Sequence, residues 1–261
     1  MQTTDDDPQG TQEPRDSKAW AKSQGTLHVR ETPEGATNLN VDGQKITGPL
    51  QGFGQMWQNT FRIRLSGCSL SPSEVMKLWK ENFVALQPEF NRFYPSSVGV
   101  EPGEVMLIDS SVPVVPGTPG VLPVATGVMI LYSDEQMFTV ITPEGHPESG
   151  WNTFSTFEED GVTVAQIQSM TRATDPLYEF GLRFMGGSRM QEKTWTHVLK
   201  SLAELCGVHS EVMMTKQVVD PSLQWSNAKN LWKNAVVRTT FFKLAAPFRW
   251  IGKRLRPTIK S

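Results

Sequence analysis

The sequence predicts an α+β protein in which a curved antiparallel β-sheet grips a long C-terminal α-helix. Two patterns support this prediction. Several segments between residues 55 and 172 alternate apolar and polar residues, which is the repeat of a β-strand. The segment that ends at Gly207 repeats apolar residues at helical spacing instead. Because a long amphipathic helix must bury its apolar side, we expect it to pack on the sheet that precedes it.

The elements follow from local signals along the chain. Ser71 and Glu74 form a capping box around Pro72, so a helix is expected between the first strand and the second. The apolar side of the closing helix consists of Trp195, Val198, Leu199, Leu202, Leu205 and Cys206. Strands are expected over residues 55–65, 104–109, 125–132, 136–142, 151–158 and 162–172.

Composition divides the chain into three parts. We expect residues 1–49 to be a disordered acidic segment, whose part after residue 25 is either a short hairpin, favoured by Asp42-Gly43, or an arm lying on the domain. Residues 50–208 are expected to form the folded domain. Residues 209–261 form a basic aromatic extension, because nine of the 25 basic residues and none of the 27 acidic residues lie between Trp225 and Ser261.

Several classes of protein are excluded or disfavoured. Two cysteines are too few for a disulfide framework, so we expect a reducing compartment. The polar, acidic start of the chain is unlike a secretory signal, and no apolar run is long enough to span a bilayer. The expected location is the cytoplasm, with contact to the inner face of the membrane as an option. The acidic domain argues against nucleic-acid binding, and the oligomeric state is not predicted.

Four segments carry a resemblance to a known superfamily: 52–65 (GFGQMWQNTFRIRL), 126–132 (TGVMILY), 142–151 (TPEGHPESGW) and 174–179 (TDPLYE). They resemble an uncharacterised bacterial branch of the START/Bet v-type helix-grip superfamily, also called SRPBCC or polyketide-cyclase-like. The resemblance implies a cavity between sheet and helix that holds a hydrophobic, lipid-like molecule. It does not decide the activity, because the superfamily contains carriers, receptors and enzymes.

Large apolar side chains and two glutamines are the candidate lining of this cavity. The alternative is that the apolar side chains fill the core and the glutamines face water. If they fill it completely, the domain is an interaction module without a pocket. The candidates are Trp57, Phe61, Met129, Leu131, Phe138, Trp151, Phe154, Gln166, Gln168, Trp195 and Leu199.

A second hypothesis is an enzyme of the cyclase or hydrolase type. His146 lies between Glu144 and Glu148, so it is the weak candidate for a general base. The alternative is that this proline-flanked segment is a rigid turn. No sequence motif for a metal, nucleotide or other cofactor is present, and none is predicted.

The extension mixes cations with aromatic residues, a combination that suits an anionic membrane surface. Packing on the acidic domain, a disordered basic tail, and docking to a protein or nucleic acid remain alternatives. The candidate contact residues are Trp225, Trp232, Lys233, Arg238, Phe241, Phe242, Lys243, Arg249, Trp250, Lys253 and Arg254.

Overall fold

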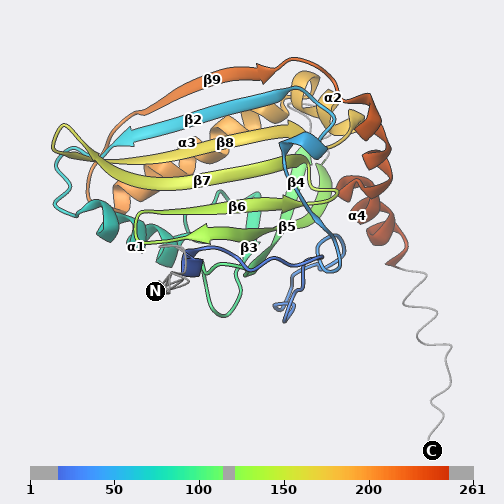
Figure 1. Cartoon of the computed structure of the whole chain (residues 1–261), viewed down its shortest axis with the longest axis horizontal. Helices are drawn as coiled ribbons and strands as arrows, with labels where there is room; N and C mark the ends of the chain where they lie inside the picture. Colours follow the sequence, from blue (N-terminus) through green and yellow to red (C-terminus); the bar gives the residue numbers. More distant parts are fainter. Residues whose placement is uncertain (1–16, 114–120, 247–261) are drawn as a thin grey trace, which may run out of the picture.

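The structure, a computed structural model, describes residues 17–113 and 121–246. Within these residues nine strands form one antiparallel sheet in the order β3-β4-β5-β6-β7-β8-β2-β9, with β1 paired to β6 (Figure 1). The sheet therefore runs continuously from an edge at β3 to an edge at β9. The strands are β1 (Ile46–Thr47), β2 (Met56–Arg64), β3 (Asn91–Tyr94), β4 (Val105–Pro113), β5 (Val121–Ser133), β6 (Met137–Pro143), β7 (Glu148–Glu159), β8 (Val162–Ala173) and β9 (Val212–Asp220).

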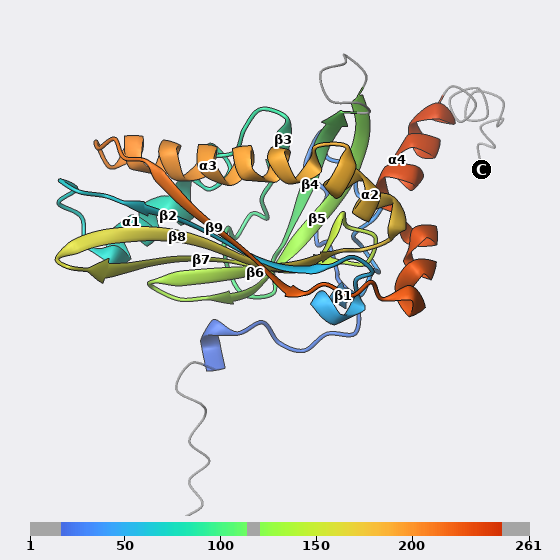
Figure 2. The ribbon, with the colours of Figure 1, turned by 90° about the horizontal axis from the view of Figure 1, so that it is seen from above.

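The long helix lies along one face of the curved sheet, as Figure 2 shows. We call the face under this helix the concave face and the opposite one the convex face. The described helices are α1 (Pro72–Asn82), α2 (Pro176–Phe184), α3 (Gly187–Leu205) and α4 (Ala235–Leu244), with 3-10 helices η1 (Ser17–Ala19), η2 (Pro49–Gln51) and η3 (Trp225–Lys233). None of the helices in these ranges is long and apolar enough to cross a membrane. The predicted fold class is confirmed.

Helix α1 begins where the capping box predicts. The backbone amide of Glu74 donates to Ser71 Oγ at 3.4 Å, and the backbone amide of Ser71 donates to Glu74 Oε2 at 2.8 Å. Pro72 occupies the first helical position, where its missing N–H leaves no partner unsatisfied. The helix buries Met76 and Trp79 against the concave face, so it covers the part of the sheet that α3 leaves open.

The concave face and α3 share the main core. Phe61, Ile167, Phe154 and Phe138 are register partners on four neighbouring strands, and each points toward the helices. The apolar side of α3 lies over them through Trp195, Val198, Leu199, Leu202 and Ala203, all of which are buried. The helix is thus held by the burial that its sequence pattern requires.

The segment before β2 is packed rather than disordered. Residues 20–47, which we call the N-terminal arm, cross the convex face, where Leu27 and Val41 are 1% and 0% exposed. They pack on Leu107 and Met129 of the sheet. The prediction of disorder for residues 1–49 is therefore wrong for the arm. It failed because two deeply buried side chains anchor an otherwise polar segment.

The chain beyond residue 208 returns to the sheet. Strand β9 pairs with β2 along its length and forms the outer edge. Helix α4 then packs on β5, where Asn40 donates to Ala125 O at 2.7 Å and Thr239 Oγ1 accepts from Ala125 N at 3.1 Å. The predicted domain end at residue 208 is therefore wrong, since residues 212–244 add a strand and a helix to the same fold.

Candidate functional site

The concave face changes from apolar to polar along β7, β8 and β2. Cross-strand register arranges the inward side chains of these strands in rows. One row is apolar and contains Phe154, Ile167 and Phe61. The next row toward α2 contains Asn152, Ser169 and Asn59, which are 7%, 1% and 4% exposed. The grip therefore has an apolar end, under most of α3, and a polar end, under α2 and the start of α3.

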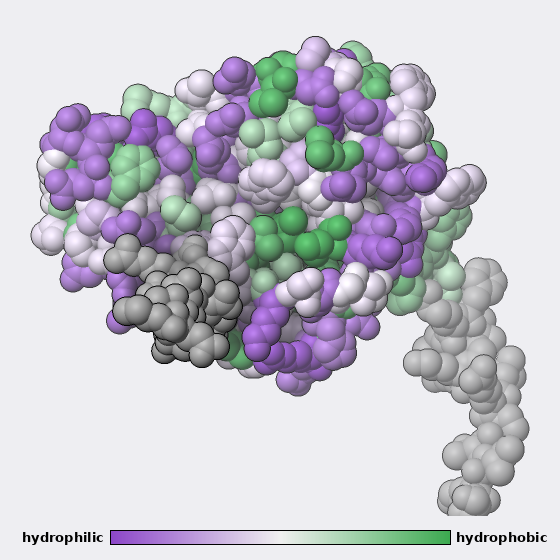
Figure 3. All heavy atoms as spheres, in the orientation of Figure 1, coloured by the Kyte–Doolittle hydropathy of each residue, from purple (hydrophilic) through white to green (hydrophobic). Residues whose placement is uncertain are grey.

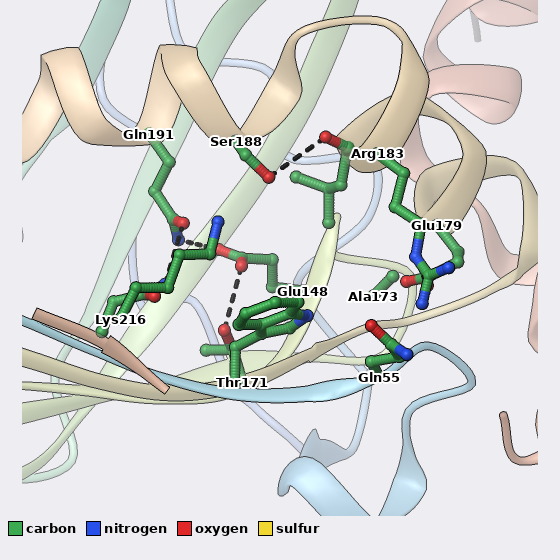
Figure 4. Close-up of a pocket in the computed structure, with 12 residues that line it drawn as sticks. Gln55, Glu148, Thr171, Ala173, Glu179, Arg183, Ser188, Gln191 and Lys216 are labelled. Carbon is green, nitrogen blue, oxygen red and sulfur yellow. Dashed lines mark hydrogen bonds and ion pairs between the residues drawn. The ribbon is translucent and has the colours of Figure 1, made fainter. Parts of the chain in front are cut away.

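A cavity of about 50 Å³ lies at the polar end, between the sheet and the two helices (Figure 4). The sheet contributes Trp57, Asn59, Glu148 and Thr171 to its lining, while Leu182 and Gln191 come from α2 and α3. Its volume suits about one or two water molecules and is far below the roughly 300–1,000 Å³ of a typical ligand pocket.

Glu148 is the central ionisable group of this cavity. Its carboxylate accepts hydrogen bonds from Thr171 Oγ1 at 3.0 Å and from Gln191 Nε2 at 2.7 Å (Figure 4). Burial raises the pKa of Glu148 above its usual value, and these two hydrogen bonds act in the opposite direction. The positive charge of Lys216 on β9 also lowers the pKa of Glu148, by less than the two hydrogen bonds do. The Lys216 ammonium lies 4.7 Å from the centre of the Trp57 ring.

The row next to the cavity contains polar atoms that lack a partner. Within the part of the chain that the structure describes, no hydrogen-bond partner is present for Asn59 Oδ1, Asn152 Oδ1 or Ser169 Oγ. The same holds for the indole Nε1 of Trp195, which α3 brings over the sheet. Each buried unsatisfied group costs about 1–3 kcal/mol. Four of them in one region point to a ligand or ordered water as the partner.

Comparisons with known proteins assign neither a family nor an activity to this chain. No family model matches the sequence, and no curated protein matches it either. Among solved structures, a START superfamily protein from Mycobacterium smegmatis is 13% identical, with a TM-score of 0.37 and coverage of 59% of this chain and 98% of that chain. Ara h 8.0201 is 14% identical, with a TM-score of 0.37 over 57% of this chain and 97% of that chain.

The di-domain ARO/CYC StfQ of the steffimycin biosynthetic pathway is 11% identical and has a TM-score of 0.42 over 59% of this chain and 53% of that chain. Each of these TM-scores is below 0.5, so none of these structures is used to assign the fold. The fold is assigned from the strand order and the position of α3 in this structure. This chain has the helix-grip fold.

Six predicted lining residues lie between the concave face and α3 of this helix-grip domain, and five of these six fill its apolar end. Phe138 and Phe154 stack with ring centroids 4.5 Å apart, and the Trp195 ring lies 5.6 Å from Phe154. Phe61 and Leu199 belong to the same buried cluster. These five side chains are packed against one another, and of the six only Trp57 lines the cavity.

The other five predicted lining residues face away from α3. Met129, Leu131 and Trp151 pack under the N-terminal arm on the convex face. Gln166 and Gln168 are also convex, and Gln168 Nε2 donates to Thr60 Oγ1 at 3.2 Å. Figure 3 shows this face, where apolar residues form small patches among polar ones. Their assignment to the cavity is wrong, because alternation identifies two faces of a strand but not which one a helix covers.

The structure does not bring together the side chains of the proposed His146 site. His146 Nδ1 lies 2.9 Å and 3.1 Å from the backbone O and N of Glu148. Burial lowers the pKa of His146 to about 4, so the ring is neutral at pH 7. Glu144 instead pairs with Lys233 of η3, at 2.6 Å between Nζ and Oε2. His146 therefore holds the turn that presents Glu148, and the Glu148 carboxylate belongs to the cavity.

None of the predicted contact residues that the structure describes is buried: Arg238 is half-buried and the other six are exposed. Trp225, Trp232 and Phe241 are exposed, although Trp225 also meets the ring of Phe53 at 5.2 Å. Arg238, Phe242 and Lys243 belong to α4. The remaining predicted residues, Arg249, Trp250, Lys253 and Arg254, lie outside the described residues.

Sequence analysis missed Asn59, Thr171, Gln191 and Lys216. One signal was available for Asn59, because a polar residue interrupts the apolar face of the predicted strand 55–65. The described residues contain no group of three or more histidine, cysteine or acidic side chains that could hold a metal ion.

Proposed function

We propose that this chain binds a small amphipathic molecule at the polar end of the grip. The observation that carries the proposal is the row of buried, unpartnered oxygens beside the cavity, on Asn59, Asn152 and Ser169. Protein cores rarely retain such groups without a partner. Binding is favoured over His146-based catalysis because the ring nitrogen of His146 contacts the backbone instead of a carboxylate.

The chemistry of the lining indicates which polar group the ligand carries. The unpartnered amide oxygens accept hydrogen bonds, and Glu148 adds a carboxylate on the same side. A ligand must therefore supply donors, and a hydroxyl group fits better than a carboxylate or phosphate, which would face these oxygens at a cost. Trp57 and Leu182 provide the apolar contacts for the remainder of the molecule.

A ligand larger than the present cavity needs α2 to move. The joint between α2 and α3 is Gly186, whose φ of 79° lies in the left-handed region that glycine adopts without strain. Helix α2 contributes Leu182 and Glu179 to the cavity wall. Displacing α2 about this joint would enlarge the polar end while leaving the aromatic core under α3 intact.

The proposal predicts opposite effects on stability and on binding for Asn59→Leu. Leucine removes the unpartnered buried oxygen and loses only the long hydrogen bond, 3.5 Å, from Asn59 Nδ2 to Gln191 Oε1, so the free energy of unfolding should stay within about 1 kcal/mol of the wild type or rise. The same change should abolish binding. We would purify the full chain gently, detect bound molecules by native mass spectrometry and extract them with solvent. Gln58→Leu, on the convex side of the same strand, is the matched control and should keep the ligand.

Two results would contradict parts of this proposal. An adduct that survives in Asn59→Leu, or is lost equally in Gln58→Leu, contradicts the placement at the polar end. Wild-type protein that carries no adduct and takes up none from a panel of matched phenols, benzoates and alkylbenzenes contradicts ligand binding. That result would favour an interaction module without a pocket.

A second observation favours contact with an anionic membrane. Leu177, Phe180 and Phe184 on the outer side of α2 are 45%, 53% and 68% exposed. Helix α4 lies at the same end of the molecule in Figure 2 and adds an exposed Phe241 and an exposed Lys243. Exposed aromatic and basic groups together suit anionic headgroups. Because α2 also lines the cavity, a bilayer would meet the chain where a ligand enters.

We expect the full chain to sediment with vesicles of phosphatidylcholine and phosphatidylserine. The double variant Phe180→Ser/Phe184→Ser should weaken this binding by about 10-fold or more, because both side chains lose apolar contact. Val98→Ser, at an equally exposed apolar residue away from α2, serves as the control. Equal binding of all three proteins, or no binding to any vesicle, would contradict a membrane contact through α2 and leave a protein partner as the occupant of this surface.

A further inference from the structure

The two cysteines of the chain meet although they are far apart in sequence. Cys68 follows β2 in the turn before α1, where its amide donates to Leu65 O at 3.0 Å. Cys206 ends α3, with its amide donating to Leu202 O at 3.1 Å. Both are free thiols that pack, partly buried, against the main core.

Contacts between the two turns confirm that the cysteines are neighbours. A Cβ built on Gly67 would lie 3.8 Å from Val208 Cγ1, so the turn after β2 touches the turn after α3. Burial, followed by the neighbouring thiol of Cys68, raises the pKa of Cys206 to about 12. Cys206 therefore stays protonated at pH 7.

We propose that Cys68 and Cys206 are an oxidisable pair that forms a disulfide and clamps the C-terminal end of α3 to the turn between β2 and α1. The residues beside them, Ser66, Gly67, Leu205 and Gly207, are exposed, so a small oxidant can approach. The clamp lies at the end of α3 remote from α2 and the cavity (Figure 2). It is independent of the ligand site.

The reaction balances with a low-molecular-weight disulfide such as oxidised glutathione as oxidant. The Cys68 thiolate attacks one sulfur of glutathione disulfide, which forms a mixed disulfide and releases one glutathione thiolate. Cys206 then loses its proton to solvent and attacks the Cys68 sulfur, which releases the second glutathione. Two protein thiols are oxidised, and one small disulfide is reduced to two thiols.

The test compares the full chain after exposure to oxidised glutathione or to dithiothreitol. Intact mass after denaturation and alkylation with N-ethylmaleimide should show a protein that has lost two hydrogens and carries no maleimide, and a digest should join the peptides of Cys68 and Cys206. The midpoint of thermal unfolding should rise by at least about 5 °C, because the bond closes a long loop of the unfolded chain. Dithiothreitol should reverse this shift.

A single variant makes the proposal falsifiable. The reaction of Cys206→Ser should stop at the mixed disulfide, with one glutathione retained on Cys68. Its midpoint of thermal unfolding should be the same after oxidised glutathione as after dithiothreitol. A wild-type protein that retains two glutathiones, forms dimers between chains, or keeps both thiols free under the same oxidant would overturn the proposal. Because no ligand is involved, these results do not depend on the function of the cavity.

Discussion

Replacing Phe154 with alanine should lower the free energy of unfolding by about 3–5 kcal/mol. Phe154 is fully buried at the centre of an aromatic cluster, where it stacks on Phe138 at 4.5 Å. Its ring also meets Trp79 at 5.5 Å, Phe83 at 5.4 Å and Trp195 at 5.6 Å. Alanine would leave a cavity that this crowded core can fill poorly, since its rings come from two helices, the turn after α1 and two strands. Equilibrium unfolding in urea measures the loss.

The matched control is Phe157→Ala, on the opposite face of the same strand. Phe157 is half-buried and lies under the Arg62 guanidinium at 5.1 Å. Its loss should cost less than half as much. Similar losses for both variants would show that the apolar end of the grip is not tightly packed, and would reopen that region as a cavity for a hydrophobic molecule.

Arg172→Met should also destabilise the protein by about 3–5 kcal/mol, because it removes one partner of a buried charge network. The Arg172 side chain is 1% exposed and contacts the Asp220 carboxylate through Nη2. Its Nη1 donates to Gly54 O at 2.6 Å and to Ser222 O at 2.9 Å. Methionine preserves much of the volume but leaves these oxygens without their donor. The measurement is again urea unfolding.

Arg92→Met is the control for this variant. Arg92 is exposed and stacks 5.0 Å from the Tyr94 ring, so its loss should change stability by less than about 1 kcal/mol. Arg172→Met with stability as high as the wild type would mean that the buried charge and its partners contribute no net free energy, as some buried ion pairs do.

The prediction of the fold depended on signals that lie within single elements. The capping box at Ser71 and the apolar side of the closing helix each identified an element, because the residues that form it are close in sequence. Strand β9 was missed because its inner and outer residues are almost all exposed, so its sequence shows no buried face. The N-terminal arm was only one of two alternatives, because the alternation around Leu27 is weak and Val41 lies in a largely polar segment.

The site was harder to predict, because its residues come together only through the register of the sheet. Asn59, Ser169 and Asn152 lie on three strands, and nothing in any one strand shows that they form a row. Phe61, Phe138, Phe154 and Trp195 were predicted to line a cavity, but these side chains fill the core instead. His146 attracted attention because carboxylates flank it in sequence, whereas the fold directs its ring to the backbone.

Strand β9 determines where this chain can be divided. A chain that stops at Val208 would contain every segment that resembles a helix-grip protein, yet β2 would become an uncovered edge with a row of unpaired backbone groups. The same cut would remove Lys216 from the cavity and Asp220 from Arg172. Such a fragment should aggregate, so the shortest self-sufficient unit extends to the end of α4. In this chain, the helix-grip segments end before the unit of folding does.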